Sequence, residues 1–241
     1  MSIKYYLKYF YFIGSNWNFK LALFTVIKEI KGEKKYDLDT IELDRLKGLS
    51  VYGDNLAHAS IYQGANYFLL EKAFDYLQEI KGNQCIVDFG CGKGRVLVVA
   101  AYYGFKKITG IEFARALCVA AERNIAKVQS LFPSTQFKVI CDDAINYKIE
   151  DDQNVFFFFN PFDEVIMLAV AKNILKSLKE NSRHIFIVYL NPLHKEIFLS
   201  AGFEEEYYLK KMEYLELSIL SNEQDLIRFS EQKKSPETSE L

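Results

Sequence analysis

The chain has 241 residues, of which 50% are hydrophobic and 26% are charged, and its formal net charge is −2. This length and apolar content suffice for a sizeable buried core, and the near-neutral charge provides no general attraction to nucleic acid. The cysteines at positions 85, 91, 118 and 141 lack the spacing of a metal site. Because no secretory signal is evident either, we expect a reducing, cytoplasmic setting.

Residues 1–47 are expected to form an N-terminal arm ahead of the main domain. The arm contains two aromatic and apolar runs, 5–13 and 19–30, with lysines scattered through both. Neither run reaches the ~18 uninterrupted apolar residues of a membrane-spanning helix. The lysines, with Trp17 between the runs, suit peripheral contact of residues 1–30 with a membrane surface. An arm packed on the domain or on another subunit is an equally good interpretation.

The most informative segment runs from Cys85 to Arg95. A short apolar run ends in Asp88, glycines follow at positions 90, 92 and 94, and an apolar helical pattern begins at once. This order predicts a buried strand, a turn without Cβ atoms, and a helix that starts at the turn. Glycine lets a ligand approach the backbone closely, because no side chain intervenes. The segment therefore predicts a cradle for a nucleoside cofactor.

Two other known glycine loops fit this segment less well. In the dinucleotide fingerprint G-x-G-x-x-G, the third glycine would stand where this chain has Arg95. A P-loop has serine or threonine after its lysine, whereas Lys93 is followed by Gly94. The spacing thus disfavours an NAD-dependent oxidoreductase, and no catalytic Tyr-x-x-x-Lys or His–Asp arrangement supports one.

Two further strands are expected to end near this turn. Residues 107–112 form a short apolar pattern that ends in Glu112, at about the spacing from Asp88 of a strand–helix–strand unit. An acid at such a strand end can accept hydrogen bonds from both hydroxyls of a ribose. Residues 136–141 predict another strand, which leads into a second acidic turn at 142–144.

The rest of the main domain, 48–230, continues an alternation of strands and helices. A buried apolar strand is expected at 155–159. The other expected elements are a helix at 66–80, a helix at 163–178, a strand at 184–190, a short helix that ends before Gly202, and strands at 204–211 and 214–221. Strands that alternate with helices predict an α/β fold with a doubly wound, mostly parallel sheet. Residues 231–241 predict a disordered tail.

The pattern Asp88-x-Gly90-x-Gly92-x-Gly94 resembles motif I of the class I S-adenosylmethionine (SAM)-dependent methyltransferases. The resemblance covers nearly all of the main domain and implies a Rossmann-like sheet of seven strands with an antiparallel closing pair. It implies that the strand-end acid and the glycine turn hold the amino-acid part of SAM. Tyr62, just before the first helix of the domain, resembles a tyrosine that closes over SAM in several of these families.

The same resemblance assigns residues to the nucleoside of SAM. It implies that Glu112 binds the ribose and that Phe113 packs on the adenine. Asp143 would accept a hydrogen bond from the adenine amino group, and the backbone N–H of Ala144 would meet a ring nitrogen. Asp142 is the alternative if the alignment is shifted by one residue.

Asn160-Pro161-Phe162 follows the strand at 155–159, at the sheet edge where open α/β folds bind ligands. It resembles motif IV of the amino-group methyltransferases, Asn/Asp-Pro-Pro-Tyr/Phe, with one proline missing. The resemblance implies that Asn160 borders SAM and, with the carbonyl beside Pro161, accepts the N–H bonds of an amine. Phe162 would stack on the target or on the methyl group. Alternatively, the asparagine and proline only terminate a strand.

The chain is similar to bacterial class I methyltransferases of unidentified substrate and to lysine methyltransferases that lack a SET domain. We expect methyl transfer from SAM to an amine, on a protein lysine or a small molecule, with S-adenosyl-L-homocysteine as the product. O-methylation of a small molecule or glycan would need a base, for which His58, Asp163 and His194 are candidates. A SAM-binding adaptor without activity is also compatible. The missing proline and the lack of a basic target-recognition region argue against nucleic acid as the acceptor.

Overall fold

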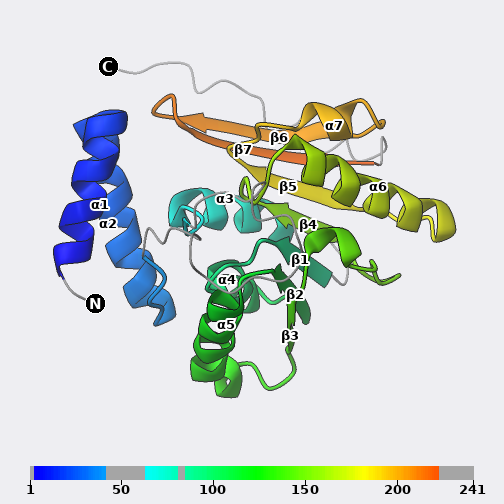
Figure 1. Cartoon of the computed structure of the whole chain (residues 1–241), viewed down its shortest axis with the longest axis horizontal. Helices are drawn as coiled ribbons and strands as arrows, with labels where there is room; N and C mark the ends of the chain where they lie inside the picture. Colours follow the sequence, from blue (N-terminus) through cyan, green and yellow to red (C-terminus); the bar gives the residue numbers. More distant parts are fainter. Residues whose placement is uncertain (1–2, 42–62, 81–84, 223–241) are drawn as a thin grey trace.

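The computed structural model describes residues 3–41, 63–80 and 85–222 (Figure 1). Its helices are α1 (Ile3–Asn16), α2 (Phe19–Tyr36), α3 (Tyr67–Gln78), α4 (Arg95–Tyr102), α5 (Arg115–Val128), α6 (Glu164–Glu180) and α7 (Glu196–Leu199), with single 3-10 turns η2 (Gln129–Leu131) and η3 (Ala144–Asn146). Its strands are β1 (Cys85–Phe89), β2 (Lys107–Glu112), β3 (Gln136–Cys141), β4 (Val155–Phe158), β5 (Phe186–Leu190), β6 (Glu204–Lys211) and β7 (Leu215–Ser221).

The strands form one seven-stranded sheet in the order β3-β2-β1-β4-β5-β7-β6. The first five strands along the chain are parallel to one another, and β7 is antiparallel to both β5 and β6. The tight turn between β6 and β7 has positive φ at Met212 and Glu213. The doubly wound, mostly parallel sheet and its antiparallel closing pair are therefore confirmed.

The strand order reverses at the middle of the sheet. The chain leaves β1 toward β2 on one side, and it later returns to β4 on the other side of β1. Ligands bind outside the carboxyl ends of the strands at such a reversal. The turn after β1 and the segment after β4 meet at this point, and they are the two segments that the sequence singled out.

The burial of β4 explains its uninterrupted apolar sequence. Val155 and Phe157 belong to a core cluster shared with α3 and α4, whereas Phe156 and Phe158 belong to a second cluster shared with α6 and α7. Successive side chains of a strand point to opposite faces, so a strand covered on both faces needs apolar residues throughout. The ring of Phe89 stacks on Phe158, with centroids 5.2 Å apart, and joins β1 to β4.

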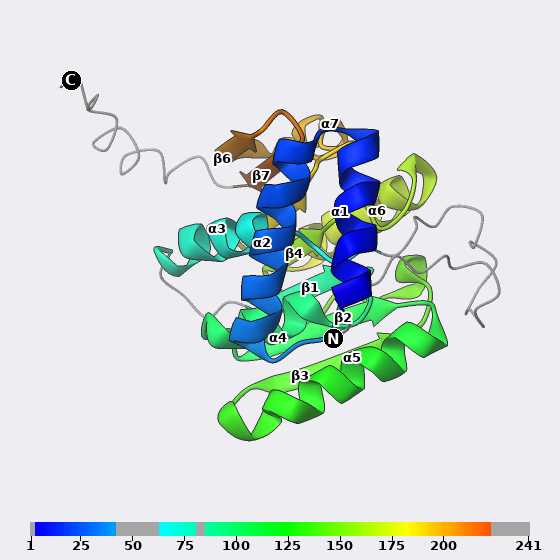
Figure 2. The same ribbon diagram turned by 90° about the vertical axis from the view of Figure 1, so that its left-hand side faces the viewer.

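Helices α1 and α2 form an antiparallel hairpin beside the sheet domain (Figures 1 and 2). The side chain of Asn18 caps α2 by accepting a hydrogen bond from the N–H of Leu21, at 2.7 Å. Gly32 of α2 lies so close to α3 that an added Cβ atom would overlap the ring of Tyr67. Within the ranges that the structure describes, no helix is both long and apolar enough to cross a bilayer.

The structure departs from the sequence predictions at the cysteines. The sequence led us to expect a reducing setting for the cysteines, whereas the structure joins Cys118 of α5 to Cys141 of β3 in a disulfide. Spacing along the chain gave no indication of this pairing, because it depends on α5 packing beside the end of β3. The predictions for Tyr62 and His58, and for the tail at 231–241, fall outside the described residues.

Candidate cofactor and active site

The glycine turn adopts backbone conformations that explain its composition. Gly90, Gly92 and Gly94 have φ of 80°, 53° and 77°, in the region that residues with side chains rarely adopt. The N–H groups of Gly90 and Cys91 both donate to the carbonyl oxygen of Ile111, at 2.9 and 3.0 Å. These two bonds tie the turn to the end of β2, so the loop is fixed before any ligand arrives.

The turn also lies against the segment that follows β4. A Cβ atom added to Gly90 would overlap Cβ of Pro161. On the other side of the turn, a Cβ atom added to Gly94 would stand 3.1 Å from Cβ of Ala121 on α5. The structure therefore brings together the two predicted motifs, the glycine turn and the Asn160–Phe162 segment.

Two buried carboxylates flank the turn. Asp88 is 3% exposed, and its Oδ2 atom has no hydrogen-bond partner among the described residues. Burial, and then the nearby Glu112, raise the pKa of Asp88 well above its ordinary value. Glu112 accepts hydrogen bonds from the N–H groups of Gly92 (3.0 Å) and Ala114 (2.9 Å). Burial raises the pKa of Glu112, while these amide bonds oppose the shift.

Cys91 lies within the turn but is not placed to act as a nucleophile. It is buried, and burial followed by the charges of Asp88 and Glu112 raises the pKa of its thiol well above the ordinary value. Its Sγ atom packs toward β2, where a Cβ atom added to Gly110 would stand 2.7 Å away. A reactive cysteine needs a lowered pKa and access to solvent, so Cys91 serves to pack the turn on β2.

The two aspartates of the acidic turn after β3 differ in burial and in hydrogen bonding. Asp143 is buried, and its Oδ1 atom caps η3 by accepting from the N–H of Ile145 at 3.1 Å. Asp142 is exposed and accepts from the N–H of Asp143 at 2.7 Å. Phe113, which follows β2, is half-buried. The sequence left open whether Asp143 or Asp142 aligns with the acid that binds the adenine amino group. Of these two residues, Asp143 is the buried one.

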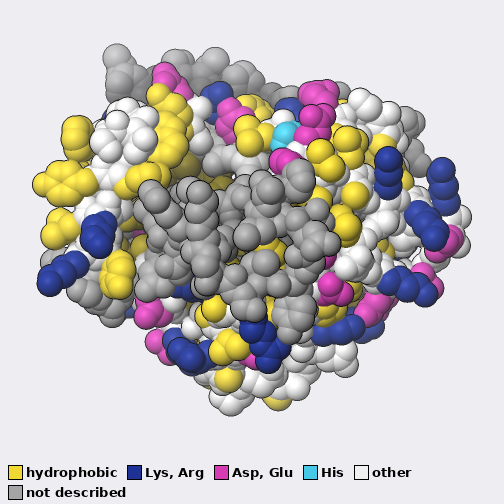
Figure 3. Space-filling model, viewed as in Figure 1, with side chains coloured by type: hydrophobic (Ala, Val, Ile, Leu, Met, Phe, Trp, Pro, Cys, Tyr) yellow, Lys and Arg dark blue, Asp and Glu magenta, His cyan; other side chains and the backbone are white. Residues whose placement is uncertain are grey.

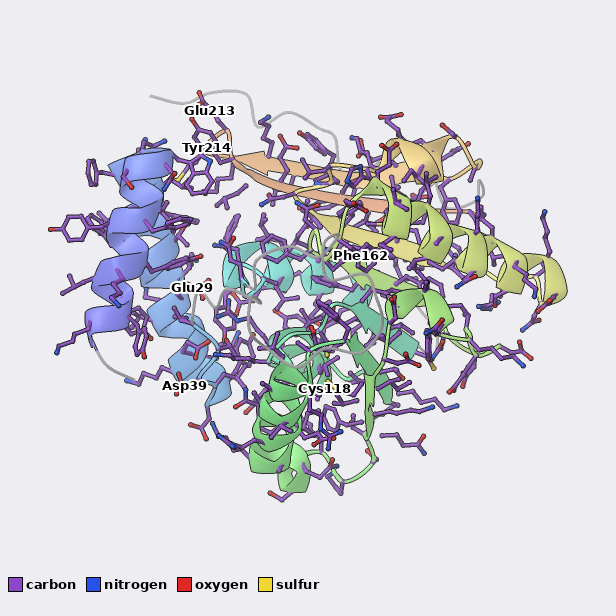
Figure 4. The ribbon with its side chains drawn as sticks, viewed as in Figure 1. Glu29, Asp39, Cys118, Phe162, Glu213 and Tyr214 are labelled. Atoms are coloured by element: carbon purple, nitrogen blue, oxygen red, sulfur yellow. A yellow bond between two sulfur atoms is a disulfide. The ribbon has the colours of Figure 1, made fainter. Side chains whose placement is uncertain are left out.

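Asn160 has the most constrained side chain of the segment after β4. Its backbone adopts a left-handed conformation, with φ of 41°. Its Nδ2 atom donates to the carbonyl oxygen of Asn191 at 2.7 Å, which fixes the orientation of the amide. The Oδ1 atom is then buried and has no partner among the residues that the structure describes. Phe162 is half-buried on the chain leaving β4, near the middle of the molecule (Figure 4).

The candidate bases are not equally placed. Asp163 caps α6, because its Oδ1 atom accepts from the N–H groups of Val165 (3.1 Å) and Ile166 (3.3 Å). His194 is half-buried in the segment after β5, close in sequence to Asn191. His58 lies outside the described ranges. No group of three His, Cys, Asp or Glu residues within those ranges could hold a metal ion.

Arg95 is a residue whose role the sequence did not reveal. It follows Gly94 and begins α4, yet its side chain is only 3% exposed. Its guanidinium forms ion pairs with Glu29 (2.8 Å) and Glu33 (3.1 Å) of α2. It also stacks on the ring of Tyr67, 4.1 Å from the centroid. The α1–α2 hairpin is thus anchored to the residue next to the glycine turn. In the sequence, the only sign of this contact was a pair of acids, Glu29 and Glu33, one helical turn apart on α2.

Comparison with known families decides the identity of this fold. The model of the family described as protein-L-isoaspartate(D-aspartate) O-methyltransferase (PCMT) matches residues 50–185, more than half of the chain. The chain belongs to the PCMT family. No curated protein matches it significantly. The expected class, a SAM-dependent methyltransferase of class I, is therefore confirmed, and the cofactor is SAM.

One solved structure described as a putative methyltransferase shares the fold of this PCMT-family chain, and two further solved structures are similar to it. "Putative methyltransferase yhhF from Escherichia coli" is 14% identical, with a TM-score of 0.51 over 68% of this chain and 90% of that one. The PH0226 protein from Pyrococcus horikoshii OT3 is 16% identical, with a TM-score of 0.49 over 65% and 92%. The Pyrococcus abyssi tRNA (uracil-54, C5)-methyltransferase in complex with S-adenosyl-L-homocysteine is 12% identical, with a TM-score of 0.47 over 66% and 39%.

The residues of this PCMT-family chain fit SAM. Gly90, Gly92 and Gly94 offer backbone without side chains, and a Cβ atom at Gly90 would already collide with Pro161. The unpartnered Oδ2 atom of Asp88 suits the ammonium group of the SAM amino-acid part. The buried carboxylate of Glu112 stands at the end of the neighbouring strand, where a ribose can bind.

Proposed function

We propose that this protein transfers the methyl group of SAM to an amine nitrogen held beside Asn160. The observation that carries this proposal is the Oδ1 atom of Asn160, which is buried, fixed in orientation and without a partner among the described residues. A buried acceptor left without a donor costs about 1–3 kcal/mol. An N–H group of the substrate amine would donate a hydrogen bond to this oxygen atom. The lone pair of the amine nitrogen would then point toward the cofactor.

The cofactor would lie in the turn at 90–94, with its amino-acid part at Asp88 and its ribose at Glu112. Phe113, Asp143 and the N–H of Ala144 would border the adenine. When bound, SAM supplies a methyl group that its sulfonium already activates, so the nitrogen lone pair takes the methyl and S-adenosyl-L-homocysteine leaves. The protein mainly has to hold the two partners in line.

Residues of this chain would position the amine nitrogen that receives the methyl group. Pro161 brings the segment against Gly90, so that Asn160 borders the cofactor cradle. Phe162 provides an apolar wall that favours the neutral form of an amine over the ammonium. The amine must lose its proton to solvent before it enters, because an ammonium has no lone pair. Asp163, which follows Phe162, caps α6 through its Oδ1 atom.

A carboxylate acceptor is the competing function, because the matching family is described as an O-methyltransferase of isoaspartate. An ionised carboxylate has no hydrogen to donate. It would place its own oxygen against the Oδ1 atom of Asn160, and two acceptors repel each other. The geometry at Asn160 therefore favours an amine over a carboxylate.

The chemistry of the product separates the two functions. The full-length protein would be incubated with radiolabelled SAM and with two peptide sets, one carrying lysine and one carrying isoaspartate, beside small-molecule amines. Methylamines withstand alkali, whereas methyl esters hydrolyse and release volatile methanol. We expect alkali-stable label on an amine. Label that appears only on isoaspartyl peptides and is lost as methanol would overturn the proposal.

A further inference from the structure

The outer face of the α1–α2 hairpin is unusually apolar. Nine of the seventeen exposed large hydrophobic side chains in the described parts of the chain belong to this hairpin. We refer to them as the hairpin face: Tyr5, Leu7, Tyr11, Phe12, Trp17, Phe19, Leu23, Ile27 and Ile30. Figure 2 shows α1 and α2 side by side, and Figure 3 shows hydrophobic side chains at the left edge, over this hairpin.

The hairpin face continues along α2 as a single stripe. Phe19, Leu23, Ile27 and Ile30 follow one another at helical spacings of four, four and three residues, so they share one side of the helix. Phe19 and Leu23 leave 58% and 56% of their surface exposed. At the turn between the helices, Trp17 contacts Tyr214 of the β6–β7 turn, with ring centroids 6.5 Å apart. Figure 4 shows Tyr214 beside the hairpin.

Charges on the hairpin are sorted by sign. The only carboxylates within α1 and α2 are Glu29 and Glu33, and both are buried against Arg95. Exposed charges on the two helices are instead lysines, among them Lys8, Lys20, Lys31 and Lys34; Lys or Arg side chains lie among the apolar ones in Figure 3. The exposed surface of the two helices is therefore apolar, aromatic and positively charged.

From this surface we propose that the hairpin face docks on an anionic lipid bilayer, lying in the interface without crossing it. Apolar and aromatic side chains would enter the headgroup and acyl boundary, while the lysines contact acidic headgroups. A second copy of the chain fits less well, because a two-fold contact of this face with itself would bring lysines against lysines. The proposal does not depend on which group the enzyme methylates.

Vesicle sedimentation tests the docking with the full-length protein. Vesicles of phosphatidylcholine alone would be compared with an equimolar mixture of phosphatidylcholine and phosphatidylglycerol. We expect binding to the mixed vesicles, and weaker binding at high salt. The variant Leu23→Glu/Ile27→Glu should bind at least about tenfold more weakly. The variant Lys20→Glu/Lys31→Glu should lose the preference for the anionic mixture.

A matched variant controls for exposed apolar residues elsewhere. Leu131→Glu/Val119→Glu changes two exposed side chains on η2 and α5, away from the hairpin face, and should bind vesicles as wild type does. Unchanged binding of S-adenosyl-L-homocysteine shows that each variant is folded. Two results would overturn the proposal. One is equal vesicle binding by wild type and Leu23→Glu/Ile27→Glu. The other is a wild type that does not bind vesicles but forms a dimer, which the Leu23→Glu/Ile27→Glu substitutions dissociate.

Discussion

The Nδ2 atom of Asn160 donates a hydrogen bond to the carbonyl oxygen of Asn191, at 2.7 Å. Asn191 is itself held by Glu216 of β7 through two hydrogen bonds, from its N–H (2.8 Å) and to its Oδ1 atom (3.0 Å). The antiparallel end of the sheet therefore sets the orientation of an amide that follows β4. This chain of contacts leaves the Asn160 oxygen as the buried acceptor on which the proposed chemistry rests.

Replacement of Asn160 by alanine should lower kcat without weakening cofactor binding. Loss of one positioned hydrogen-bonding group in an active site typically lowers kcat by about 100- to 1,000-fold. We expect S-adenosyl-L-homocysteine to bind this variant with nearly wild-type affinity, because Asp88 and Glu112 remain. Steady-state kinetics and calorimetric titration would measure the two quantities.

Asn181→Ala is a suitable control for the Asn160 variant. Asn181 also donates from its amide to a backbone oxygen, that of Asp151 at 3.0 Å, but it lies at the far end of α6. Its activity should stay close to that of wild type. A kcat for Asn160→Ala equal to that of the control would exclude the proposed role of the amide.

Binding of S-adenosyl-L-homocysteine should release protons. Burial and the charge of Glu112 raise the pKa of Asp88, so its carboxyl keeps a proton to a higher pH in the free protein than an ordinary aspartate does. A ligand ammonium beside Asp88 favours the ionised form, so affinity should rise with pH through the range where Asp88 titrates. Calorimetry in buffers of different ionisation enthalpy measures the protons released. Asp88→Asn should release fewer protons; an identical release would show that Asp88 does not face the ligand.

Stability should fall as pH rises toward neutrality because of Glu29. Burial, with a smaller effect of Glu33, raises the pKa of Glu29 from 4.5 to about 7, although Arg95 opposes the shift. Between pH 4.5 and about 7, the folded chain thus keeps a proton on Glu29 that the unfolded chain has lost. The free energy of unfolding therefore decreases over this pH range, by an amount on the order of 3 kcal/mol. Urea unfolding at several pH values would show a smaller decrease for Glu29→Gln. Equal slopes in both proteins would argue against this burial.

Removal of the disulfide should destabilise the domain. The bond between Cys118 and Cys141 closes a loop of 23 residues and restricts the unfolded chain. Loss of such a cross-link lowers the free energy of unfolding by about 3 kcal/mol. Urea unfolding of oxidised wild type and of Cys118→Ser/Cys141→Ser would measure the difference. If a reductant leaves the unfolding of wild type unchanged, the two thiols are not joined.

The sheet could be predicted from the sequence because its signals are local. The glycines after Asp88 need positive φ, the acid of Glu112 ends its strand, and the continuous apolar run at 155–158 matches a strand covered on both faces. Each of these features follows from residues close together in the chain. The resemblance to class I methyltransferases then supplied the number of strands and the antiparallel closing pair, but not the order of the strands.

Features that depend on distant residues could not be predicted in this way. Arg95 was seen only as a departure from a glycine fingerprint, because its partners Glu29 and Glu33 lie more than 60 residues earlier. The orientation of Asn160 depends on Asn191, which follows a different strand. Side-chain contacts of this kind arise from packing between elements, and periodicity along one element does not contain them.

The most direct test of the account compares S-adenosyl-L-homocysteine binding in wild type, Gly92→Val and Gly104→Val. Both glycines have positive φ, 53° and 88°, so valine strains the backbone at either site. Gly104 has open space around it and lies outside the turn, whereas Gly92 forms the centre of the turn at 90–94. We predict wild-type affinity for Gly104→Val and a loss of at least about 100-fold, or roughly 2.7 kcal/mol, for Gly92→Val. Wild-type affinity in a folded Gly92→Val protein would contradict the assignment of this turn to the cofactor.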